Sequence, residues 1–303
     1  MNLLITGAWQ EAGKYINEIR SMGHAVCFLQ WERDALPCDP VWVEGVIGNG
    51  LFLTHPIETF PNLRYIQLTS AGLDRVPVEY IKERGITICN ARGVYSIPMA
   101  EHAVAGVLCL YRQMNVFFRQ QEERLWEKRR GLAELSGKEV LIVGCGSVGT
   151  ECAVRFRAFG CRVCGIDLFP REDAAFDAIS GIEQLDARLP DTDILILTVP
   201  LSDGTRHLID RERMLMLKKN AVIVNLARGG VLDLDAFVSL KQQGSSLMAV
   251  LDVFEEEPLR QDHPVWAMED VVVTPHNSFI GEGNGTRLAQ VILGNLKKQE
   301  KET

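Results

Sequence analysis

The sequence has no long hydrophobic run, an excess of negative over positive charge and no pattern of a disulfide framework. Its longest uninterrupted apolar run, residues 103–111, is far shorter than the ~20 residues that span a bilayer, and predicts a buried helix. The formal net charge is −8 and the isoelectric point is about 5.4, which argues against a nucleic-acid or anionic-membrane surface. We therefore expect no nucleic-acid and no membrane partner.

The N-terminal segment lacks the basic residues and the apolar core of a secretory signal peptide, so we expect a cytoplasmic protein. The eight cysteines mostly lie within apolar runs, as expected for reduced thiols in an intracellular enzyme. Cys161 and Cys164 fall in a predicted strand, where residues three apart face opposite sides. We therefore expect no redox motif and no metal site.

What the sequence does contain is typical of a globular protein with two domains. It has 303 residues, of which 47% are hydrophobic and 24% are charged, and its mean hydropathy is +0.02. A chain of this length is long for a single hydrophobic core and sufficient for two.

The chain is organised around residues 139–167, where a glycine-rich turn follows an apolar run and precedes a helix-like segment. The turn residues are Gly144, Cys145, Gly146, Ser147, Val148 and Gly149. Their G-x-G-x-x-G spacing is the fingerprint of a dinucleotide-binding βαβ unit, in which the helix N-terminus faces the pyrophosphate. Asp167 ends the second apolar run, at about the 20-residue spacing of the carboxylate that binds the ribose of NAD.

Five short apolar runs separated by helix-length segments predict a first, smaller α/β domain with a parallel sheet. The runs are residues 2–6, 24–29, 43–47, 64–68 and 86–89. Asn49 and Gly50 follow the third run, and Ala71 and Gly72 follow the fourth, at the carboxyl ends where open α/β sheets bind ligands. The alternative is that these glycines only shape turns.

The segment that follows predicts a long helix between the two domains. Ser96 and Pro98 suit a helix start, and apolar residues recur at spacings of three and four as far as Met114. A helix of ~20 residues would span ~30 Å, enough to cross between domains. The charged residues 119–134 are then expected to form a surface connection that Trp126 anchors.

Six further apolar runs predict a doubly wound dinucleotide domain, for which six strands are the full count. They are residues 140–143, 161–166, 193–199, 221–225, 247–251 and 271–273. The last three runs are followed by an arginine, a carboxylate and a histidine: Arg228, Glu257 and His276. Each alone could be an ordinary surface residue, but together, at matching strand ends, they indicate an active site beside the expected nicotinamide.

The chain resembles the D-isomer-specific 2-hydroxyacid dehydrogenase family over nearly its whole length. The resemblance is carried by GCGSVG with Asp167, NLARGG, DVFEEEPL, TPHNS and NARGVYSIPMAEH. It implies two doubly wound parallel-sheet α/β domains, with a Rossmann NAD-binding domain, residues 98–278, inserted into a smaller flavodoxin-like substrate domain, residues 1–97 and 279–303. It also implies an NAD-dependent enzyme that interconverts 2-oxo acids and D-2-hydroxy acids, and a homodimer formed through residues 98–130.

By this resemblance the catalytic residues are Arg228, Glu257 and His276. A guanidinium can bind the carboxylate and the carbonyl of a 2-oxo acid together, which suits Arg228. Hydride transfer leaves an alkoxide that needs a proton, and an imidazolium, here that of His276, is the natural acid. Glu257 would orient the ring and favour its charged form, with Glu255 or Glu256 as the alternative register.

The resemblance also implies the residues that contact the cofactor and the substrate. Besides the fingerprint and Asp167, the cofactor contacts are Pro200, Thr205, Leu226, Ala227, Asp252 and Asn277. The substrate carboxylate would be bound by backbone N–H groups of Asn49, Gly50, Ala71 and Gly72. NAD is the expected cofactor because Asp167 would repel the 2′-phosphate of NADP, and Arg171 is the one residue that could weaken this preference.

Residues 47–52 predict the kind of substrate side chain. Phosphoglycerate-type members of the family carry arginine and lysine there, whereas this chain has no basic residue in that loop, and an unpaired phosphate in a closing cleft is costly. Leu51 and Phe52 instead suggest an apolar wall for small or hydrophobic side chains. Alternatively, Leu51 and Phe52 begin a helix and pack into the core, and Arg75 or Arg92 enters the pocket.

Two other functions stay open on the sequence. The first is an NAD(H)-sensing binding protein of the same fold, which the intact set of Arg228, Glu257 and His276 disfavours. The second is a phosphoglycerate- or glyoxylate-type dehydrogenase, while a formate-type enzyme is disfavoured because glutamine replaces the glutamate there. Cys145, which lies between two fingerprint glycines, is expected to react with thiol reagents and to be protected by NADH.

Overall fold

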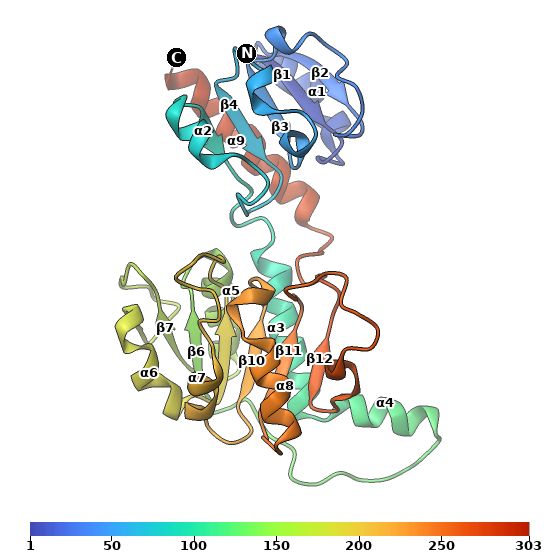
Figure 1. Ribbon diagram of the computed structural model, residues 1–303, viewed down its shortest axis with the longest axis vertical. Coiled ribbons are helices and arrows are strands. Elements are labelled where there is room, and N and C mark those ends of the chain that lie inside the picture. The colour runs from blue at the N-terminus through green and yellow to red at the C-terminus, as the bar shows by residue number, and fades with distance from the viewer. Residues whose placement is uncertain (303) are drawn as a thin grey trace. The chain divides into compact units, whose positions relative to one another are not determined.

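The computed structural model describes the backbone of residues 1–302 and the side chains of residues 1–299. It divides into two compact units, shown in Figure 1. Unit 2 is Ser96–Ile280, and unit 1 consists of Met1–Tyr95 together with the segment that begins at Gly281. Unit 2 is therefore inserted into the chain of unit 1.

Unit 1 is a five-stranded parallel sheet with helices on both faces. Its elements are β1 (Asn2–Thr6), α1 (Ala12–Ser21), β2 (Ala25–Leu29), η1 (Pro40–Trp42), β3 (Gly45–Gly48), η2 (Leu51–Leu53), η3 (Ile57–Thr59), β4 (Tyr65–Leu68), α2 (Val78–Glu83), β5 (Thr87–Cys89) and α9 (Asn284–Glu302). The strand order is β2-β1-β3-β4-β5, which is the flavodoxin-like order. The five predicted runs thus correspond to five strands.

The two faces of this sheet bury alternate residues of each strand. In β1, Leu3 and Ile5 pack in one cluster with Ile292 of α9, while Leu4 packs in a second cluster with Ile66 of β4. Because both faces are covered, central strands such as β1 and β3 are buried over most of their length. The C-terminal helix α9 therefore completes the core of unit 1.

Unit 2 is a seven-stranded parallel sheet, also with helices on both faces. Its elements are α3 (Ser96–Tyr111), α4 (Met114–Glu122), β6 (Glu139–Val143), α5 (Ser147–Ala158), β7 (Arg162–Ile166), β8 (Ala178–Ser180), η4 (Ile182–Gln184), α6 (Leu185–Arg188), η5 (Leu189–Asp191), β9 (Ile194–Leu197), α7 (Arg211–Met216), β10 (Val222–Asn225), η6 (Gly229–Val231), α8 (Leu234–Gln242), β11 (Met248–Leu251), η7 (Pro264–Ala267) and β12 (Val271–Val273). The order is β12-β11-β10-β9-β6-β7-β8. Two parallel-sheet α/β units, one inserted into the other, confirm the predicted fold class.

The count of six strands for this sheet is wrong, because β8 is a seventh. β8 is a three-residue strand, Ala178–Ser180, which pairs with β7 at the edge of the sheet. It is too short and too exposed to produce an apolar run, so the hydrophobic pattern could not indicate it.

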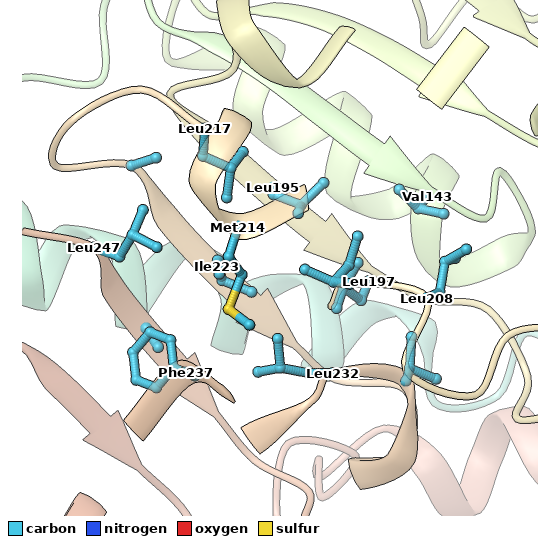
Figure 2. Close-up of a cluster of buried hydrophobic side chains, with 14 of the residues drawn as sticks. Val143, Leu195, Leu197, Leu208, Met214, Leu217, Ile223, Leu232, Phe237 and Leu247 are labelled. Atoms are coloured by element: carbon cyan, nitrogen blue, oxygen red, sulfur yellow. The ribbon is translucent and has the colours of Figure 1, made fainter. Parts of the chain in front are cut away.

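The core of unit 2 shows the same alternation. In β9, Ile194 and Ile196 join a cluster with α3 and α5, whereas Leu195 and Leu197 join a cluster with Met214 of α7 and Phe237 of α8. Figure 2 shows the second cluster, in which Met214 and Phe237 lie against the same face of the sheet as Leu195 and Leu197. The sheet is thereby fixed from both sides, and its strand ends are rigid supports for loops.

Two predictions about the crossover segment are wrong. The single helix is broken, because Gln113 between α3 and α4 adopts a left-handed conformation with φ of 51°. Trp126 does not anchor the segment to the rest of the described chain, since its side chain is 97% exposed. Helix α4 is instead held by Asn115, whose amide donates to the Glu269 carbonyl at 2.5 Å, and by an Arg119–Glu269 ion pair at 3.0 Å.

Within the described chain, no helix has the length and apolar character needed to cross a membrane.

Candidate active site and cofactor site

The predicted functional residues of unit 2 all lie at one edge of its sheet. They follow the carboxyl ends of the parallel strands, where α/β sheets bind ligands. Along the sheet they are His276 and Asn277 after β12, Asp252 and Glu257 after β11, Leu226, Ala227 and Arg228 after β10, Pro200 and Thr205 after β9, the fingerprint after β6 and Asp167 after β7.

The fingerprint turn has the close packing that a dinucleotide needs. Gly144 has φ of +99°, and a Cβ on Gly149 would lie 2.1 Å from the Gly144 carbonyl oxygen, so neither position accepts a side chain. Helix α5 begins at Ser147, directly after Gly146, which has no side chain to cap the first-turn N–H groups. These groups are therefore available to a pyrophosphate. The hydroxyl of Thr198, at the end of β9, donates to the Gly144 carbonyl at 2.6 Å and holds the turn.

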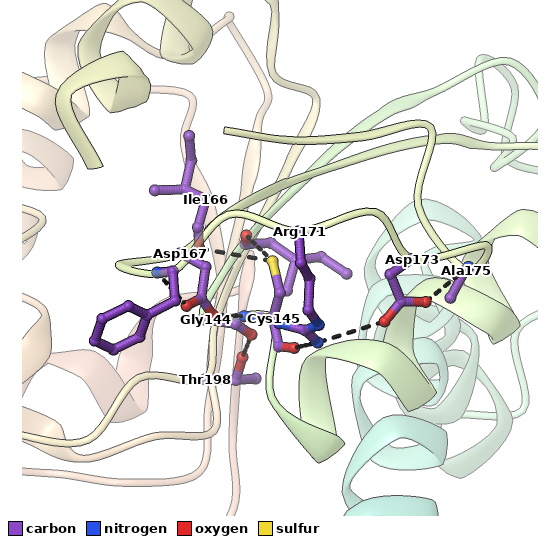
Figure 3. Close-up of polar contacts among 10 residues, drawn as sticks. Gly144, Cys145, Ile166, Asp167, Arg171, Asp173, Ala175 and Thr198 are labelled. Atoms are coloured by element: carbon purple, nitrogen blue, oxygen red, sulfur yellow. Dashed lines mark hydrogen bonds and ion pairs between the residues drawn. The ribbon is translucent and has the colours of Figure 1, made fainter. Parts of the chain in front are cut away.

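Asp167 braces the same turn, as Figure 3 shows. One of its carboxylate oxygens accepts the Cys145 N–H at 2.7 Å, and the other accepts the Phe169 N–H at 3.0 Å. Arg171 donates to the Cys145 carbonyl at 2.5 Å and lies 3.4 Å from a carboxylate oxygen of Asp173. Asp167 and Arg171 thus both contact Cys145 of the fingerprint, and Arg171 already has an anionic partner in Asp173.

The expectation of a reactive Cys145 is wrong. Its side chain is fully buried and fills the space above Gly165, where a Cβ would lie 2.3 Å from Sγ. Burial raises the pKa of the Cys145 thiol to about 12. Since the thiolate is the reacting form, this cysteine is neither ionised near neutral pH nor accessible.

His276 and Glu257 form a hydrogen-bonded pair. His276 Nδ1 lies 2.8 Å from Glu257 Oε2, and Glu257 Oε1 accepts the Phe254 N–H at 3.0 Å. The other glutamate with a described partner, Glu255, lies 2.6 Å from His207 Nε2 instead. Of the alternative registers, the geometry therefore pairs Glu257 with His276.

The loop that carries His276 is built around Asp252. This carboxylate is fully buried and accepts the Thr274 hydroxyl at 2.5 Å and the N–H groups of Asn277 at 2.8 Å and Ser278 at 2.9 Å. The Asp252 carbonyl also accepts the His276 N–H at 2.7 Å. Together these bonds hold His276 in a left-handed conformation, with φ of 51°, that a histidine rarely adopts.

His102 and Thr274 belong to this network but were absent from the residues predicted for the site. His102 Nε2, on α3, lies 3.1 Å from the Thr274 hydroxyl. Burial lowers the pKa of His102, and the nearby Asp252 charge opposes this only partly. Both residues lie in motifs that carry the family resemblance: His102 is the histidine of NARGVYSIPMAEH, and Thr274 is the threonine of TPHNS. Nothing in those motifs indicates that the two side chains touch.

Arg228 lies on a turn that is pressed against the loop of Glu257. The buried Asn225 donates to the Arg228 carbonyl at 3.0 Å and accepts the Ala227 N–H at 3.1 Å. A Cβ on Gly229 would lie 1.9 Å from the Phe254 carbonyl carbon, so the two backbones touch there. The guanidinium is half-buried and donates to the Ala227 carbonyl at 2.8 Å.

The loop after β9 is shaped by Thr205. Its hydroxyl donates to the Pro200 carbonyl at 2.7 Å and accepts the Ser202 N–H at 2.7 Å. This closes the turn next to the fingerprint strand, because β9 pairs directly with β6.

Comparison with known proteins decides the family. A family model described as D-isomer specific 2-hydroxyacid dehydrogenase, NAD binding domain, matches residues 104–278. The chain belongs to this family. The match confirms the predicted family resemblance and the NAD cofactor. At the level of the family, it also confirms the class of NAD-dependent dehydrogenases.

Dehydrogenases and reductases of this family are similar to the chain over most of its length. It is 33% identical to D-3-phosphoglycerate dehydrogenase of Methanocaldococcus jannaschii over 84% of the chain, but spans only 48% of that relative. It is 31% identical to (S)-sulfolactate dehydrogenase of Chromohalobacter salexigens, over 80% of this chain and 79% of that relative. It is 32% identical to glyoxylate reductase of Korarchaeum cryptofilum, over 88% of this chain and 84% of that relative.

Solved structures of the dehydrogenase family share the fold. One from Aeromonas salmonicida is 26% identical, with a TM-score of 0.84 over 100% of this chain and 96% of that one. Another, from Xanthobacter autotrophicus in complex with NADPH and MES, is 26% identical, with a TM-score of 0.79 over 99% of this chain and 95% of that one.

In unit 1, the four predicted carboxylate-binding residues differ in availability. Within the described chain, the N–H groups of Ala71 and Gly72 donate to no protein group. The N–H groups of Asn49 and Gly50 instead donate to the carboxylate of Glu32, each at 2.7 Å. One pair of N–H groups is thus open to a ligand and the other is occupied.

The apolar wall predicted from Leu51 and Phe52 is wrong for Leu51. Leu51 is 1% exposed and lies in the core of unit 1, within η2. Phe52 packs against the same core and meets the Phe60 ring edge-on at 6.1 Å between centroids. The alternative prediction, that these side chains begin a helical turn and enter the core, holds for their packing.

Proposed function

We propose that this chain is an NAD-dependent oxidoreductase that interconverts a 2-oxo acid and a D-2-hydroxy acid. The observation that carries the proposal is the His276–Glu257 pair, at 2.8 Å, on the same sheet edge as the dinucleotide fingerprint. A histidine oriented by a carboxylate is the arrangement that proton transfer to a developing alkoxide requires.

Each catalytic side chain has a separate task in this proposal. The fingerprint turn and Asp167 would hold NADH, which would supply the hydride when bound. His276 uses Nδ1 to bind Glu257, which leaves Nε2 to give its proton to the substrate oxygen during reduction and to take it back during oxidation. Arg228 binds the substrate and polarises its carbonyl.

In unit 1, the N–H groups of Ala71 and Gly72 are our candidates for holding the substrate carboxylate. They are consecutive donors at the carboxyl end of β4, and their carbonyls face other partners: Ser70 Oγ donates to Gly72 O at 3.2 Å, and Asn90 donates to Ala71 O at 2.7 Å. Paired backbone N–H groups of this kind bind anions without a cationic side chain.

Replacing Glu257 by glutamine tests the proton-transfer role. The amide preserves the shape of the pair but replaces a charged acceptor by a neutral one, so the hydrogen bond that orients the His276 ring is weaker. The kcat for 2-oxo acid reduction should therefore fall by roughly 10-fold or more. Glu255→Gln, in the His207 pair, is the matched control and should leave kcat close to the wild-type value. Equal kcat values for wild type and Glu257→Gln would show that Glu257 is not the functional partner of His276.

NADH should be preferred over NADPH by roughly 10-fold or more in kcat/KM, since like charges brought together at a binding site are strongly unfavourable. The carboxylate of Asp167 would face the 2′-phosphate, and Arg171 is already paired with Asp173 at 3.4 Å. Steady-state kinetics with both cofactors measures this, and comparable values would count against the role of Asp167.

We further propose that the protein is a cytoplasmic homodimer, in which α4 and the residues after it form the contact. The side chains of Phe118, Leu125 and Trp126 are 54%, 46% and 97% exposed, an unusual concentration of exposed apolar groups on one segment. Light scattering should give a dimer mass for wild type and a monomer mass for Phe118→Glu combined with Trp126→Glu. Leu215→Glu, at another exposed leucine, is the control and should remain dimeric. A wild-type monomer would contradict the proposed dimer.

The cytoplasmic location is supported by a separate observation. All eight cysteines are free thiols, which agrees with a reducing compartment.

A further inference from the structure

A carboxylate of the protein itself occupies an anion-binding position in unit 1. Glu32, which follows β2, accepts the Asn49 N–H at 2.7 Å, the Gly50 N–H at 2.7 Å and the Thr6 hydroxyl at 2.8 Å. Its donors therefore come from the ends of β1 and β3. Gly48 leaves the room for this contact, because a Cβ there would lie 2.6 Å from Glu32 Oε1.

The charge of Glu32 is not neutralised by a cation. In the part of the chain that the structure describes, no lysine, arginine or histidine makes an ion pair with Glu32. Two backbone N–H groups and one hydroxyl bind the carboxylate. Such charge-assisted hydrogen bonds fix its position but bring no positively charged side chain to it. A second anion in this place would have to displace Glu32 or lie against its charge.

This occupied position is next to the open one. β3 pairs with β4, and the Thr69 N–H donates to the Gly48 carbonyl at 2.9 Å, so the loop of Asn49 is adjacent to the loop of Ala71. Unit 1 thus has two neighbouring pairs of backbone donors at one sheet edge. One pair is available to a carboxylate, and the other is closed by Glu32.

We propose that Glu32 determines substrate specificity by closing the second pair of donors, so that the enzyme selects against 2-oxo acids whose side chain carries a phosphate, sulfonate or second carboxylate. The inference rests on the proposed function, because it takes the substrate to be a 2-oxo acid. In this inference, the negative charge of Glu32, and not an apolar wall formed by Leu51 and Phe52, excludes substrates with anionic side chains. Substrates with small or uncharged side chains do not meet this charge.

The kinetic test compares Glu32→Gln with wild type on phosphohydroxypyruvate, oxaloacetate and pyruvate. The ratio of kcat/KM for either dianionic acid to that for pyruvate should rise by roughly 10-fold or more, because a repulsive charge is removed. Glu83→Gln, which makes the same charge change on the exposed end of α2, is the matched control and should leave the ratio unchanged. A ratio that is the same in wild type, Glu32→Gln and Glu32→Ala would overturn the inference.

A binding test separates this inference from the proposed function, because it needs no turnover. Inorganic phosphate is titrated into ¹⁵N-labelled wild type and Glu32→Ala, and the amide resonances of Asn49 and Gly50 are followed. We expect them to shift in Glu32→Ala and not in wild type. Shifts of equal size in both proteins, or in neither, would show that Glu32 does not close an anion position, whatever the enzyme reduces. Glu32→Ser, which also removes the carboxylate from the two N–H groups, serves in the same titration if the alanine variant does not fold.

Discussion

Replacing His276 by alanine should lower kcat for 2-oxo acid reduction by at least about 100-fold, the typical effect of losing a general acid, and should leave the affinity for NADH nearly unchanged. The imidazole is positioned by the Glu257 carboxylate at 2.8 Å and by the backbone bond from His276 N–H to the Asp252 carbonyl at 2.7 Å. No neighbouring side chain in that loop offers a titratable proton in its place.

His207→Ala is a closely matched control for that variant. His207 also pairs with a glutamate, Glu255, at 2.6 Å, and also has a left-handed backbone conformation, with φ of 47°. It lies after β9 and has no role in the proposed mechanism. Its replacement should leave kcat close to the wild-type value, and an equal loss in both variants would mean that the effect of His276→Ala is structural.

Arg228→Ala should cause a loss of similar size, because the substrate loses the group that binds it and polarises its carbonyl. Arg228→Lys should recover only part of the activity, since an ammonium lacks the planar fork of donors. The split between kcat and KM distinguishes this from His276→Ala, in which KM should change little. Full recovery with lysine would show that only a positive charge is needed at this position.

Gly229→Ala should also have a large effect, on both stability and activity. The new Cβ would lie 1.9 Å from the Phe254 carbonyl carbon and 2.2 Å from the Glu255 nitrogen, and backbone atoms cannot rotate away. The free energy of unfolding should fall by about 1–3 kcal/mol, as for other overpacked positions. Displacement of the turn by ~1 Å would also move Arg228 and cost on the order of 100-fold in turnover.

Gly13→Ala is the control for the glycine substitution. Gly13 lies in α1, and a Cβ there has no atom within 4 Å, so alanine should be neutral or slightly stabilising through helix propensity. Thermal unfolding and kcat/KM are measured for both variants. If Gly229→Ala unfolds and turns over like Gly13→Ala, the close approach of the two backbones is not important for the active site.

The sheets were predictable because both faces of each are buried. Strands such as β6, β9 and β10 each contain a run of at least three consecutive buried apolar residues, which leaves a clear signal in the sequence. The strand ends then followed, and with them the positions of Arg228, Glu257 and His276 on one edge. The edge strand β8 lacked that signal, and the break at Gln113 depends on a backbone conformation that no residue pattern specified.

The side-chain contacts were less predictable, because they join residues far apart in the chain. Glu32 is 17 residues from Asn49, and nothing in the sequence near either residue indicates their hydrogen bond. The contact of His102 with Thr274 spans 172 residues. The sequence places Leu51 in a pocket wall because phosphoglycerate-type members of the family carry basic residues in the corresponding loop. The 3-10 turn that Leu51 begins instead points it into the core, where it is 1% exposed.

Oxidation of NADH by the purified protein in the presence of 2-oxo acids tests the central claim most directly. With glyoxylate, pyruvate, 2-oxoisocaproate and phenylpyruvate, the proposed function predicts loss of NADH absorbance with at least one acid, and chiral chromatography should identify the product as the D-2-hydroxy acid. Tight NADH binding with no turnover of any 2-oxo acid would contradict the claim and favour an NAD(H)-sensing binding protein of the same fold.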